Sequence, residues 1–284
     1  MSGQNRNGVS MAIIERAMRE CLGSGEVANA AIWHLSSGGS RVRAHLAIDA
    51  AHRANLSQSV ATSLATACEL LHNASLVHDD LQDHDTHRRG RPALWAKYGK
   101  NTAICAGDLM ISAAFAALCT LGPKASSAVK LAHRAVAETI RGQAEDLASK
   151  PDCKPEQYMA IAKAKSGPLL ALPLQLVLLQ VAETETTIEA AYITASDVAL
   201  AYQITDDLTD RDRDLNALSP NACLSLEAAG HSIDGARRHA RHLACDALQM
   251  AEAASSKLPF GVGCALGVLI GSLQQKILEI PNAA

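Results

Sequence analysis

The chain has 284 residues, a net charge of −3 and 48% hydrophobic residues, which is enough to build a hydrophobic core and excludes a chain that is disordered throughout. Aromatic residues make up only 3%, which disfavours an all-β sandwich or barrel and the aromatic platforms that stack on single-stranded nucleic acid. The near-neutral charge offers no basic field to nucleic acid or to anionic lipid, so we expect no nucleic-acid partner.

Helical periodicity dominates the chain, and no strand-like alternation is present. Because no linker or low-complexity stretch divides the sequence, we predict one all-α domain over residues 1–284. In chain order, the predicted helices cover residues 10–23, 25–36, 41–54, 57–82, 101–121, 124–149, 155–181, 186–211, 231–256 and 260–278.

We expect no targeting signal in this sequence. The first ten residues, MSGQNRNGVS, contain no apolar segment, so we predict no signal peptide. The longest apolar run, Phe260–Ile270, is too short to span a bilayer. None of the 8 cysteines forms a CxxC pair, and we interpret them as buried free thiols. We therefore expect a cytoplasmic protein without stable membrane insertion.

Two acidic clusters share one spacing. The first contains Asp79, Asp80 and Asp83, and the second contains Asp206, Asp207 and Asp210. Carboxylates at i and i+4 project from one face of a helix, where they repel each other unless a cation lies between them. If both clusters point into one cavity, they supply the hard oxygen ligands that Mg²⁺ prefers, with phosphate completing the coordination. The pattern therefore predicts a Mg²⁺ site and a diphosphate substrate.

Basic residues near the clusters support this interpretation. Arg88 and Arg89 can grip phosphate oxygens bidentately, and Lys165 provides a compact point charge. Arg41 and Arg43 follow Gly38-Gly39, where the backbone can approach an anion closely. His72 precedes the first cluster by one to two helical turns.

Taken together, these blocks resemble the trans-isoprenyl diphosphate synthases, the polyprenyl synthetase family. The resemblance runs over most of the chain in family order. Its blocks are Gly38-Gly39-Ser40-Arg41-Val42-Arg43, His72-Asn73-Ala74-Ser75-Leu76-Val77-His78-Asp79-Asp80, Asp83 with Arg88-Arg89-Gly90, Ala106-Gly107-Asp108, Gly142-Gln143 with Asp146, Lys165-Ser166, and Tyr202-Gln203 with Asp206, Asp207 and Asp210.

The resemblance implies helices around a central cavity, a homodimer, and a head-to-tail (1′-4) condensation of isopentenyl diphosphate with an allylic diphosphate. It implies two or three Mg²⁺ ions on Asp79, Asp83 and Asp206, with Asp80, Asp207 and Asp210 in support. Arg88, Lys165, Ser166 and Gln203 would bind the allylic diphosphate. Arg43, His72 and Arg89 would bind isopentenyl diphosphate, with Arg41 as a further candidate. The catalytic set would be Asp79, Asp83, Arg88, Lys165 and Asp206.

Three departures from the family pattern stand out. Ser40 occupies the place of a lysine, a loss that Arg41 is a candidate to compensate, and Ala44 replaces a proline. No lysine occurs between residues 166 and 256, where the family has lysines after the second acidic motif. Either Arg211 or Arg213 substitutes for them, or this segment is a shortened, exposed loop.

Product length would depend on the depth of the cavity. Ala74 and Ser75, five and four residues before Asp79, are small and leave room for a chain beyond C15. Leu71, one turn deeper, and Phe115 on the facing helix are the candidate floor. We therefore expect mainly a C20 (geranylgeranyl) product, with C15 and C25 or longer as alternatives.

Two other functions remain open at this point. A class I terpene cyclase also uses a DDxxD motif, although the second DDxxD and the double arginine favour a second diphosphate. A regulatory subunit of a heteromeric prenyl synthase would fit the missing lysines, although such subunits usually lose aspartates that are present here.

Overall fold

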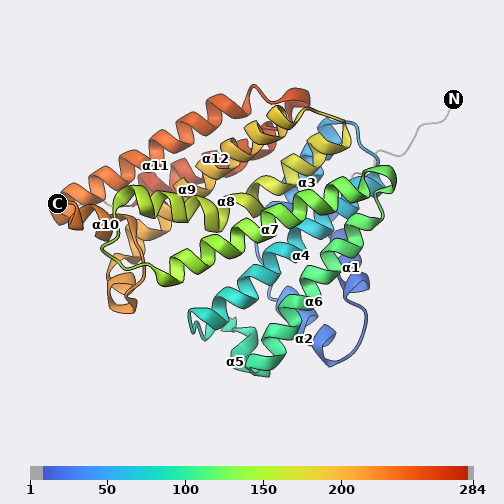
Figure 1. Ribbon diagram of the computed structural model, residues 1–284, viewed down its shortest axis with the longest axis horizontal. Helices are drawn as coiled ribbons and strands as arrows, with labels where there is room; N and C mark the ends of the chain where they lie inside the picture. Colours follow the sequence, from blue (N-terminus) through green and yellow to red (C-terminus); the bar gives the residue numbers. More distant parts are fainter. Residues whose placement is uncertain (1–8, 281–284) are drawn as a thin grey trace. The chain divides into compact units, whose positions relative to one another are not determined.

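The computed structural model describes residues 9–280 and is all-α, as predicted, apart from one small hairpin (Figure 1). Residues 1–8, which carry most of the sequence behind the signal-peptide prediction, lie outside the described residues. Within the described range the helices are α1 (Met11–Leu22), α2 (Glu26–Leu35), α3 (Val42–Arg53), α4 (Gln58–Gln82), α5 (Leu94–Tyr98), α6 (Lys100–Cys119), α7 (Ala125–Ala148), α8 (Pro155–Gln180), α9 (Glu185–Ala217), α10 (Ala222–Ala228), α11 (Ile233–Ser255) and α12 (Cys264–Glu279).

All ten predicted helices are present, and four details differ. Helix α9 continues to Ala217 instead of ending at residue 211, so the segment interpreted as a loop is helical. The last helix begins at Cys264, after a short 3₁₀ turn at Pro259–Gly261. Helices α5 and α10 have 5 and 7 residues and were missed, because such short segments show too little periodicity.

A two-stranded antiparallel hairpin, β1 (His87–Arg88) and β2 (Arg91–Pro92), was also missed. Strands of two residues are too short for alternation to register in the sequence. The hairpin carries Arg88 and Arg89 and therefore belongs to the candidate site.

Contacts within the chain define two compact units. The N-terminal unit comprises residues up to Ala132 together with Leu179–Val181. In it, α4 packs against α1, α3, α5 and α6, and Figure 1 shows α4 beside α6. Its fully buried side chains are mostly alanine and leucine, which suits a chain with few aromatic residues.

The C-terminal unit comprises His133–Leu178 and the residues from Ala182 onward. In it, α9 packs against α10, α11 and α12. Glycines allow close helix contacts here: a Cβ on Gly142 would lie 2.4 Å from the backbone nitrogen of Lys165, and one on Gly167 would lie 2.6 Å from Ser196 Oγ. These glycines set the distance of α8 from α7 and α9.

The eight cysteines are free, as predicted, but the prediction that they are buried is confirmed for only two, Cys68 and Cys223. Cys21 and Cys153 are half-buried, and Cys105, Cys119, Cys245 and Cys264 are exposed. Apolar sequence neighbours do not reveal which face of a helix a residue occupies.

Helix α6 is the one helix among the described residues with the length and composition to cross a membrane. Its mean hydropathy reaches 1.8, and 44% of that window is buried. Core helices of globular proteins meet the same criteria, so the finding alone assigns no membrane role.

Candidate functional site

The first acidic motif lies at the C-terminal end of α4. Asp79 and Asp80 occupy the last turn and Asp83 is the C-cap residue. Carboxylates at this end of a helix are disfavoured by the helix dipole as well as by each other, so they need a cation. Arg88 supplies it: Nε donates to Asp80 Oδ1, and Nη2 lies 3.3 Å from Asp79 Oδ2.

The hairpin aims its two arginines at different targets. Its two turn residues, Arg89 (φ 54°) and Gly90 (φ 73°), are both left-handed, as a two-residue type I′ turn requires. Arg88 reaches the acidic motif, while Arg89 Nη1 donates to the carbonyl oxygen of Gly38. A Cβ on Gly39 would lie 2.4 Å from Arg89 Cζ, so glycine is needed there for the guanidinium to approach the backbone.

A basic cluster forms beside this loop. Arg43 Nη1 donates to His72 Nε2 at 3.2 Å. Burial, together with the charges of Arg43 and Arg89, lowers the pKa of His72 well below its usual value. Burial and the charge of Arg89 also lower the pKa of His34 to about 4. Such concentrated positive charge is suited to bind an anion, and the N-terminal unit brings Arg43, His72 and Arg89 together as predicted.

Arg41 has a different setting. It is 7% exposed and has a left-handed backbone (φ 48°). Its Nε donates to Glu15 at 2.7 Å, its Nη2 donates to the carbonyl of Leu35 at 2.6 Å, and Glu69 lies 3.8 Å from Nη1. Ser40 is exposed. The guanidinium of Arg41 is thus used to anchor the loop from inside, whereas Ser40 faces solvent.

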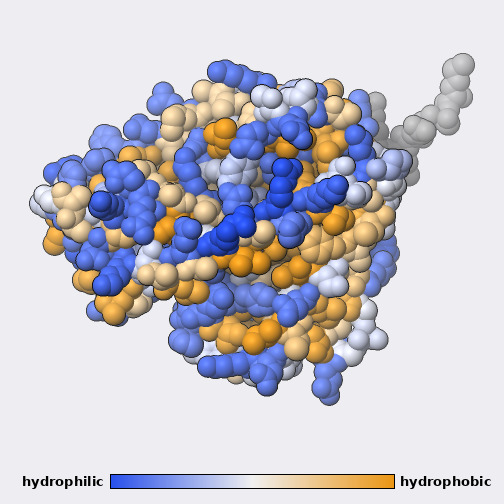
Figure 2. All heavy atoms as spheres, in the orientation of Figure 1, coloured by the Kyte–Doolittle hydropathy of each residue, from blue (hydrophilic) through white to orange (hydrophobic). Residues whose placement is uncertain are grey.

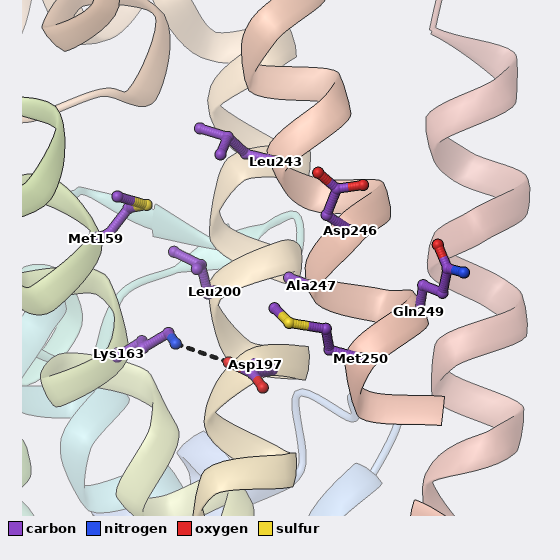
Figure 3. A pocket seen from close by; sticks show the side chains of 9 residues that line it. All are labelled: Met159, Lys163, Asp197, Leu200, Leu243, Asp246, Ala247, Gln249 and Met250. Carbon is purple, nitrogen blue, oxygen red and sulfur yellow. Dashed lines mark hydrogen bonds and ion pairs between the residues drawn. The ribbon is translucent and has the colours of Figure 1, made fainter. Parts of the chain in front are cut away.

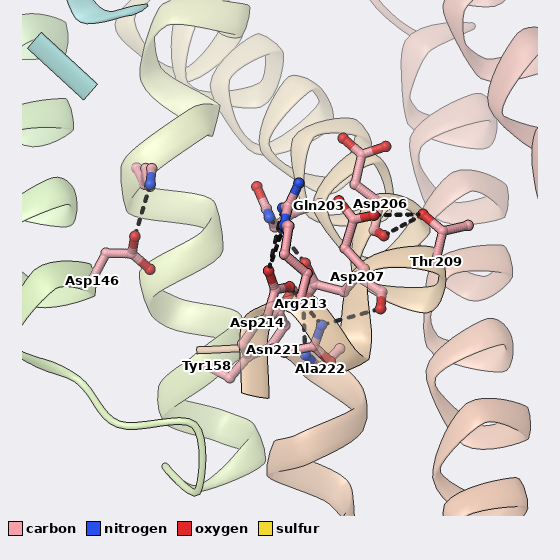
Figure 4. A network of polar contacts seen from close by, with 12 residues as sticks. Asp146, Tyr158, Gln203, Asp206, Asp207, Thr209, Arg213, Asp214, Asn221 and Ala222 are labelled. Atoms are coloured by element: carbon pink, nitrogen blue, oxygen red, sulfur yellow. Dashed lines mark hydrogen bonds and ion pairs between the residues drawn. The ribbon is translucent and has the colours of Figure 1, made fainter. Parts of the chain in front are cut away.

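The second acidic motif lies within α9 (Figure 4). Asp207 is 2% exposed, and both of its carboxylate oxygens accept hydrogen bonds from the protein. The hydroxyl of Tyr158 donates to Oδ2 at 2.6 Å and the backbone N–H of Ala222 at 2.7 Å. Gln203 donates to Oδ1 at 3.1 Å. Asp207 therefore ties α9 to α8 and to the start of α10.

Asn221 extends this network. Its side chain donates to the backbone carbonyl of Asp207 at 3.1 Å and to Asp214 Oδ2 at 2.9 Å, and it caps α10. Burial raises the pKa of Asp207 to about 7, although the hydrogen bond from Tyr158 opposes the shift. In the first motif, burial likewise raises the pKa of Asp80 to about 6 against the effect of Arg88.

The other acidic residues of the second motif are half-buried and paired with cations. Lys276 of α12 lies 2.6 Å from Asp206 Oδ1, and Arg213 lies 2.9 Å from Asp210 Oδ2. Lys165 of α8 donates to Asp146 of α7 at 2.7 Å, which joins two of the sequence blocks, and its neighbour Ser166 is half-buried.

Sequence reasoning missed three polar residues of these clusters. Lys276 lies 70 residues after Asp206, the carboxylate that it contacts. Asn221 follows the end of α9 and contacts Asp214 only through the turn between α9 and α10. His34 stands alone in an apolar helix. The sequence carried one signal for Tyr158, because its spacing of seven residues from Lys165, two helical turns, places the two residues on one face of α8.

The donor set fits Mg²⁺. Within residues 9–280, no group of three or more His, Cys, Asp or Glu side chains is arranged as a preformed metal site. Mg²⁺ sites that bind a phosphate ligand need only one or two protein carboxylates, because phosphate oxygens and water supply the rest. Each motif offers carboxylate oxygens alone, and Oδ2 of Asp80 is buried without a hydrogen-bond partner.

The candidate chain-length residues lie on two helices that pack together, α4 and α6. Leu71 and Ala74 are buried, whereas Ser75 and Phe115 are half-buried. Ser75 Oγ donates to the carbonyl of His72 at 2.8 Å, which places it next to the basic cluster. Their effect on product length stays a prediction.

A separate cavity of about 490 Å³ opens between α8, α9 and α11 of the C-terminal unit (Figure 3). Lys163 and Asp197 form an ion pair of 2.7 Å on its wall, and Met159 and Met250 contribute apolar surface. None of the predicted site residues lines it.

Comparison with known proteins gives a consistent result. A family model described as "Polyprenyl synthetase" matches residues 26–224. The (2E,6E)-farnesyl diphosphate synthase of Mycobacterium tuberculosis is 36% identical over 173 residues, which are 60% of this chain and 48% of that protein. Heptaprenyl diphosphate synthase component 2 of Geobacillus stearothermophilus is 30% identical over 205 residues, 70% of this chain and 63% of that protein. The match thus spans about half the length of the mycobacterial relative.

Solved structures share the fold. The polyprenyl synthase of Caulobacter crescentus, crystallised with calcium and isoprenyl diphosphate, has a TM-score of 0.83 and 21% identity and covers 94% of both chains. The similarity at this identity concerns the fold, and it agrees with the prediction of an all-α architecture.

Proposed function

Because the chain belongs to the polyprenyl synthetase family, we propose that it is a Mg²⁺-dependent trans-prenyltransferase, with residues 1–284 acting as one catalytic domain. It joins isopentenyl diphosphate to an allylic diphosphate, head to tail, and gives a linear all-trans prenyl diphosphate. The observation that carries this proposal is the setting of the two acidic motifs: each holds an accessible carboxylate beside a cation, Asp79 with Arg88 and Asp206 with Lys276.

Each residue group has a distinct task in this reaction. Asp79, Asp83 and Asp206 hold Mg²⁺, with Asp80, Asp207 and Asp210 in support. The metal, when bound, neutralises the charge that develops on the diphosphate leaving group. Arg88 and Lys165 add positive charge to that diphosphate, which lowers the barrier to breaking the allylic C–O bond. Ser166 and Gln203 complete its binding.

The second substrate belongs to the basic cluster of the N-terminal unit. Arg43, His72 and Arg89 bind the diphosphate of isopentenyl diphosphate and so fix the position of its double bond for attack on the allylic carbon. The backbone of Gly38 and Gly39 lies against Arg89 and shapes this site. The low pKa of His72 keeps its imidazole neutral, so the positive charge comes from the arginines.

We further propose a mainly C20 product. The two relatives above carry names of synthases for chains of different length, farnesyl and heptaprenyl. The small side chains of Ala74 and Ser75 support a product longer than C15. Incubation of the purified protein with Mg²⁺, labelled isopentenyl diphosphate and each allylic primer should give C20 as the main product. A main product of C15 or shorter would contradict the prediction that Ala74 and Ser75 leave room for a longer chain.

The floor itself can be tested with a matched pair of variants. Leu71 and Leu70 are neighbours on α4 that are 2% and 0% exposed, so truncating either removes the same buried volume. Leu71→Ala should lengthen the product, while Leu70→Ala should leave its length unchanged. Equal product distributions in the two variants would remove Leu71 from the floor.

We also propose a cytoplasmic homodimer in which α6 contacts a second copy. Ile104 is 46% exposed on this apolar helix, together with Cys105 and Cys119. In Figure 2, hydrophobic side chains gather over this part of the visible face. Light scattering should give twice the chain mass of 29.8 kDa. Ile104→Asp should halve it, whereas a monomeric wild-type protein would contradict the proposal.

A further inference from the structure

Lys276 lies at the second acidic motif although it is far away in sequence. It belongs to α12, which packs against α9, and its Nζ is 2.6 Å from Asp206 Oδ1. The ammonium group is also 5.9 Å from the centre of the Tyr202 ring, one helical turn before Asp206. Residue 276 lies outside the range matched by the family model, 26–224. The family comparison therefore assigns it no role.

The two arginines that follow the second motif, Arg211 and Arg213, form ion pairs with other carboxylates. Arg211 forms a bidentate pair with Glu227, with two N–O distances of 2.6 Å, and it also binds Asp212. Arg213 contacts Asp210 and Asp214. The segment also lacks lysine from residue 167 to residue 256.

The ion pair between Lys276 and Asp206 can be broken at little cost in stability. Its side chains are 46% and 34% exposed, and exposed ion pairs contribute little to stability. By contrast, the side chains of Arg211 and Glu227 are 17% and 19% exposed in a bidentate pair. Lys276 is thus a cation that can leave its carboxylate without disrupting α9.

We propose that Lys276 is a diphosphate-binding residue that replaces the lysines missing after the second acidic motif. In the free protein its ammonium group neutralises Asp206. With Mg²⁺ and the allylic diphosphate bound, Asp206 would hold the metal and the ammonium group of Lys276 would bind a diphosphate oxygen. The inference rests on the proposed function and adds one residue to the binding of the leaving group.

The long, flexible side chain of lysine suits this exchange. A lysine presents three rotatable N–H donors at the end of four methylene groups, whereas the N–H donors of an arginine are fixed in the plane of its guanidinium group. The hydrogen bond from Lys276 Nζ holds the ammonium group beside Asp206.

The test measures the binding of inorganic pyrophosphate to the full-length protein by calorimetry in the presence of Mg²⁺. Lys276→Gln should weaken binding by about tenfold, the loss expected for one charge-assisted contact. Lys276→Arg should stay within about threefold of the wild type, which shows that the charge and not the fold was lost. The matched control is Lys257→Gln, which removes an exposed lysine of the same unit.

A second measurement uses Mn²⁺ alone, followed by its paramagnetic resonance signal. Because Lys276 competes with the metal for Asp206, Lys276→Gln should bind Mn²⁺ at least as tightly as the wild type while binding pyrophosphate less tightly. Unchanged or tighter pyrophosphate binding in Lys276→Gln would overturn the inference. If the wild type itself fails to bind pyrophosphate with Mg²⁺, the proposed function fails instead.

Discussion

The two acidic motifs have the same spacing but opposite surroundings. The first ends a helix and is neutralised by Arg88 from a hairpin that follows within ten residues, in a region rich in arginine. The second lies inside a long helix, and one of its carboxylates is enclosed by Tyr158, Ala222 and Gln203. Its cation, Lys276, comes from 70 residues further along the chain.

This difference separates two roles within each Asp-Asp pair. Asp79 and Asp206 are half-buried, and each forms an ion pair, Asp79 with Arg88 and Asp206 with Lys276. Asp80 and Asp207 are 0% and 2% exposed and bonded within the protein. We infer that the first aspartate of each pair is the principal metal ligand, while the second supports it by fixing the helix.

The largest expected effect concerns the first aspartates. Asp79→Asn and Asp206→Asn should each lower kcat for condensation by at least about a hundredfold, because a metal ligand that stabilises the leaving group is lost. Thermal stability should stay close to that of the wild type. Asp85→Asn, an exposed carboxylate near the first motif, is the control. Turnover near the wild-type rate in either variant would refute the assignment of that motif.

The second aspartates should instead affect folding. Asp207→Ala leaves the Tyr158 hydroxyl and the Ala222 N–H buried without an acceptor, at a cost of about 2–4 kcal/mol in the free energy of unfolding. Urea denaturation measures it, with Asp206→Ala as the matched variant in which no buried group loses its partner. Equal stability of the two variants would show that the buried network contributes nothing.

The burial of His34 beside the arginines of the first motif should be visible in the pH dependence of stability. The pKa of His34 is lowered from 6.5 to about 4 in the folded protein. Below pH 6.5 the unfolded chain therefore binds a proton that the folded chain does not, and stability falls as pH falls.

Between pH 7.5 and pH 5, the free energy of unfolding of the wild type should drop by about 2 kcal/mol more than that of His34→Gln. His72 contributes to both proteins and cancels in the difference. Parallel pH profiles would show that the pKa of His34 is the same in the folded and the unfolded protein.

The loop beside the first motif should affect one substrate only. Gly39→Ala places a Cβ against the guanidinium of Arg89 and should raise KM for isopentenyl diphosphate about tenfold, with KM for the allylic substrate unchanged. Gly38→Ala is the matched control, since Gly38 also has a positive φ but its Cβ would meet nothing within 4 Å. If both variants behave alike, backbone strain and not the clash is responsible.

The smallest expected effect is a gain. Ser40 is exposed at the same loop, and Arg41 is held by Glu15 and Leu35, so Arg41 does not reach the place of the missing lysine. Ser40→Lys should lower KM for isopentenyl diphosphate several-fold by adding a charge-assisted contact. Steady-state kinetics with Ser40→Gln as the uncharged control would detect it; an unchanged KM would show that another group already fills this role.

Much of the fold could be predicted from the sequence, because apolar residues recur with the helical period over many turns of a long helix. The ten predicted helices were all found, whereas α5, α10 and the hairpin escaped because their signals are only a few residues long. The end of α9 was misplaced because the charged run Arg211-Asp212-Arg213-Asp214 looks like a loop. In the structure, Arg213 bonds to Asp210 one helical turn earlier and Asp214 bonds to Asn221.

The site was predictable wherever the residues are close in sequence. The spacing of Asp79 and Asp83 indicated that the first motif needs a cation, and Mg²⁺ was the cation predicted. The ion pairs of Arg88 with Asp79 and Asp80 were not predicted, because Arg88 was interpreted only as a phosphate-binding residue. The burial of Asp207 and the contact of Lys276 with Asp206 depend on tertiary packing of α8, α10 and α12 against α9, which no local pattern encodes. The glycine at position 39 was visible as a motif, but its reason, the approach of Arg89, was not.

The most direct test of the account supplies the purified wild-type protein with isopentenyl diphosphate alone, with an allylic diphosphate alone, and with both, each with Mg²⁺ or with a chelator. We predict a longer prenyl diphosphate and one released pyrophosphate per coupling only when both substrates and Mg²⁺ are present. A hydrocarbon formed from the allylic diphosphate alone would indicate a terpene cyclase. Turnover that appears only after a second protein is added would indicate a subunit of a heteromeric enzyme, and either result would contradict the account.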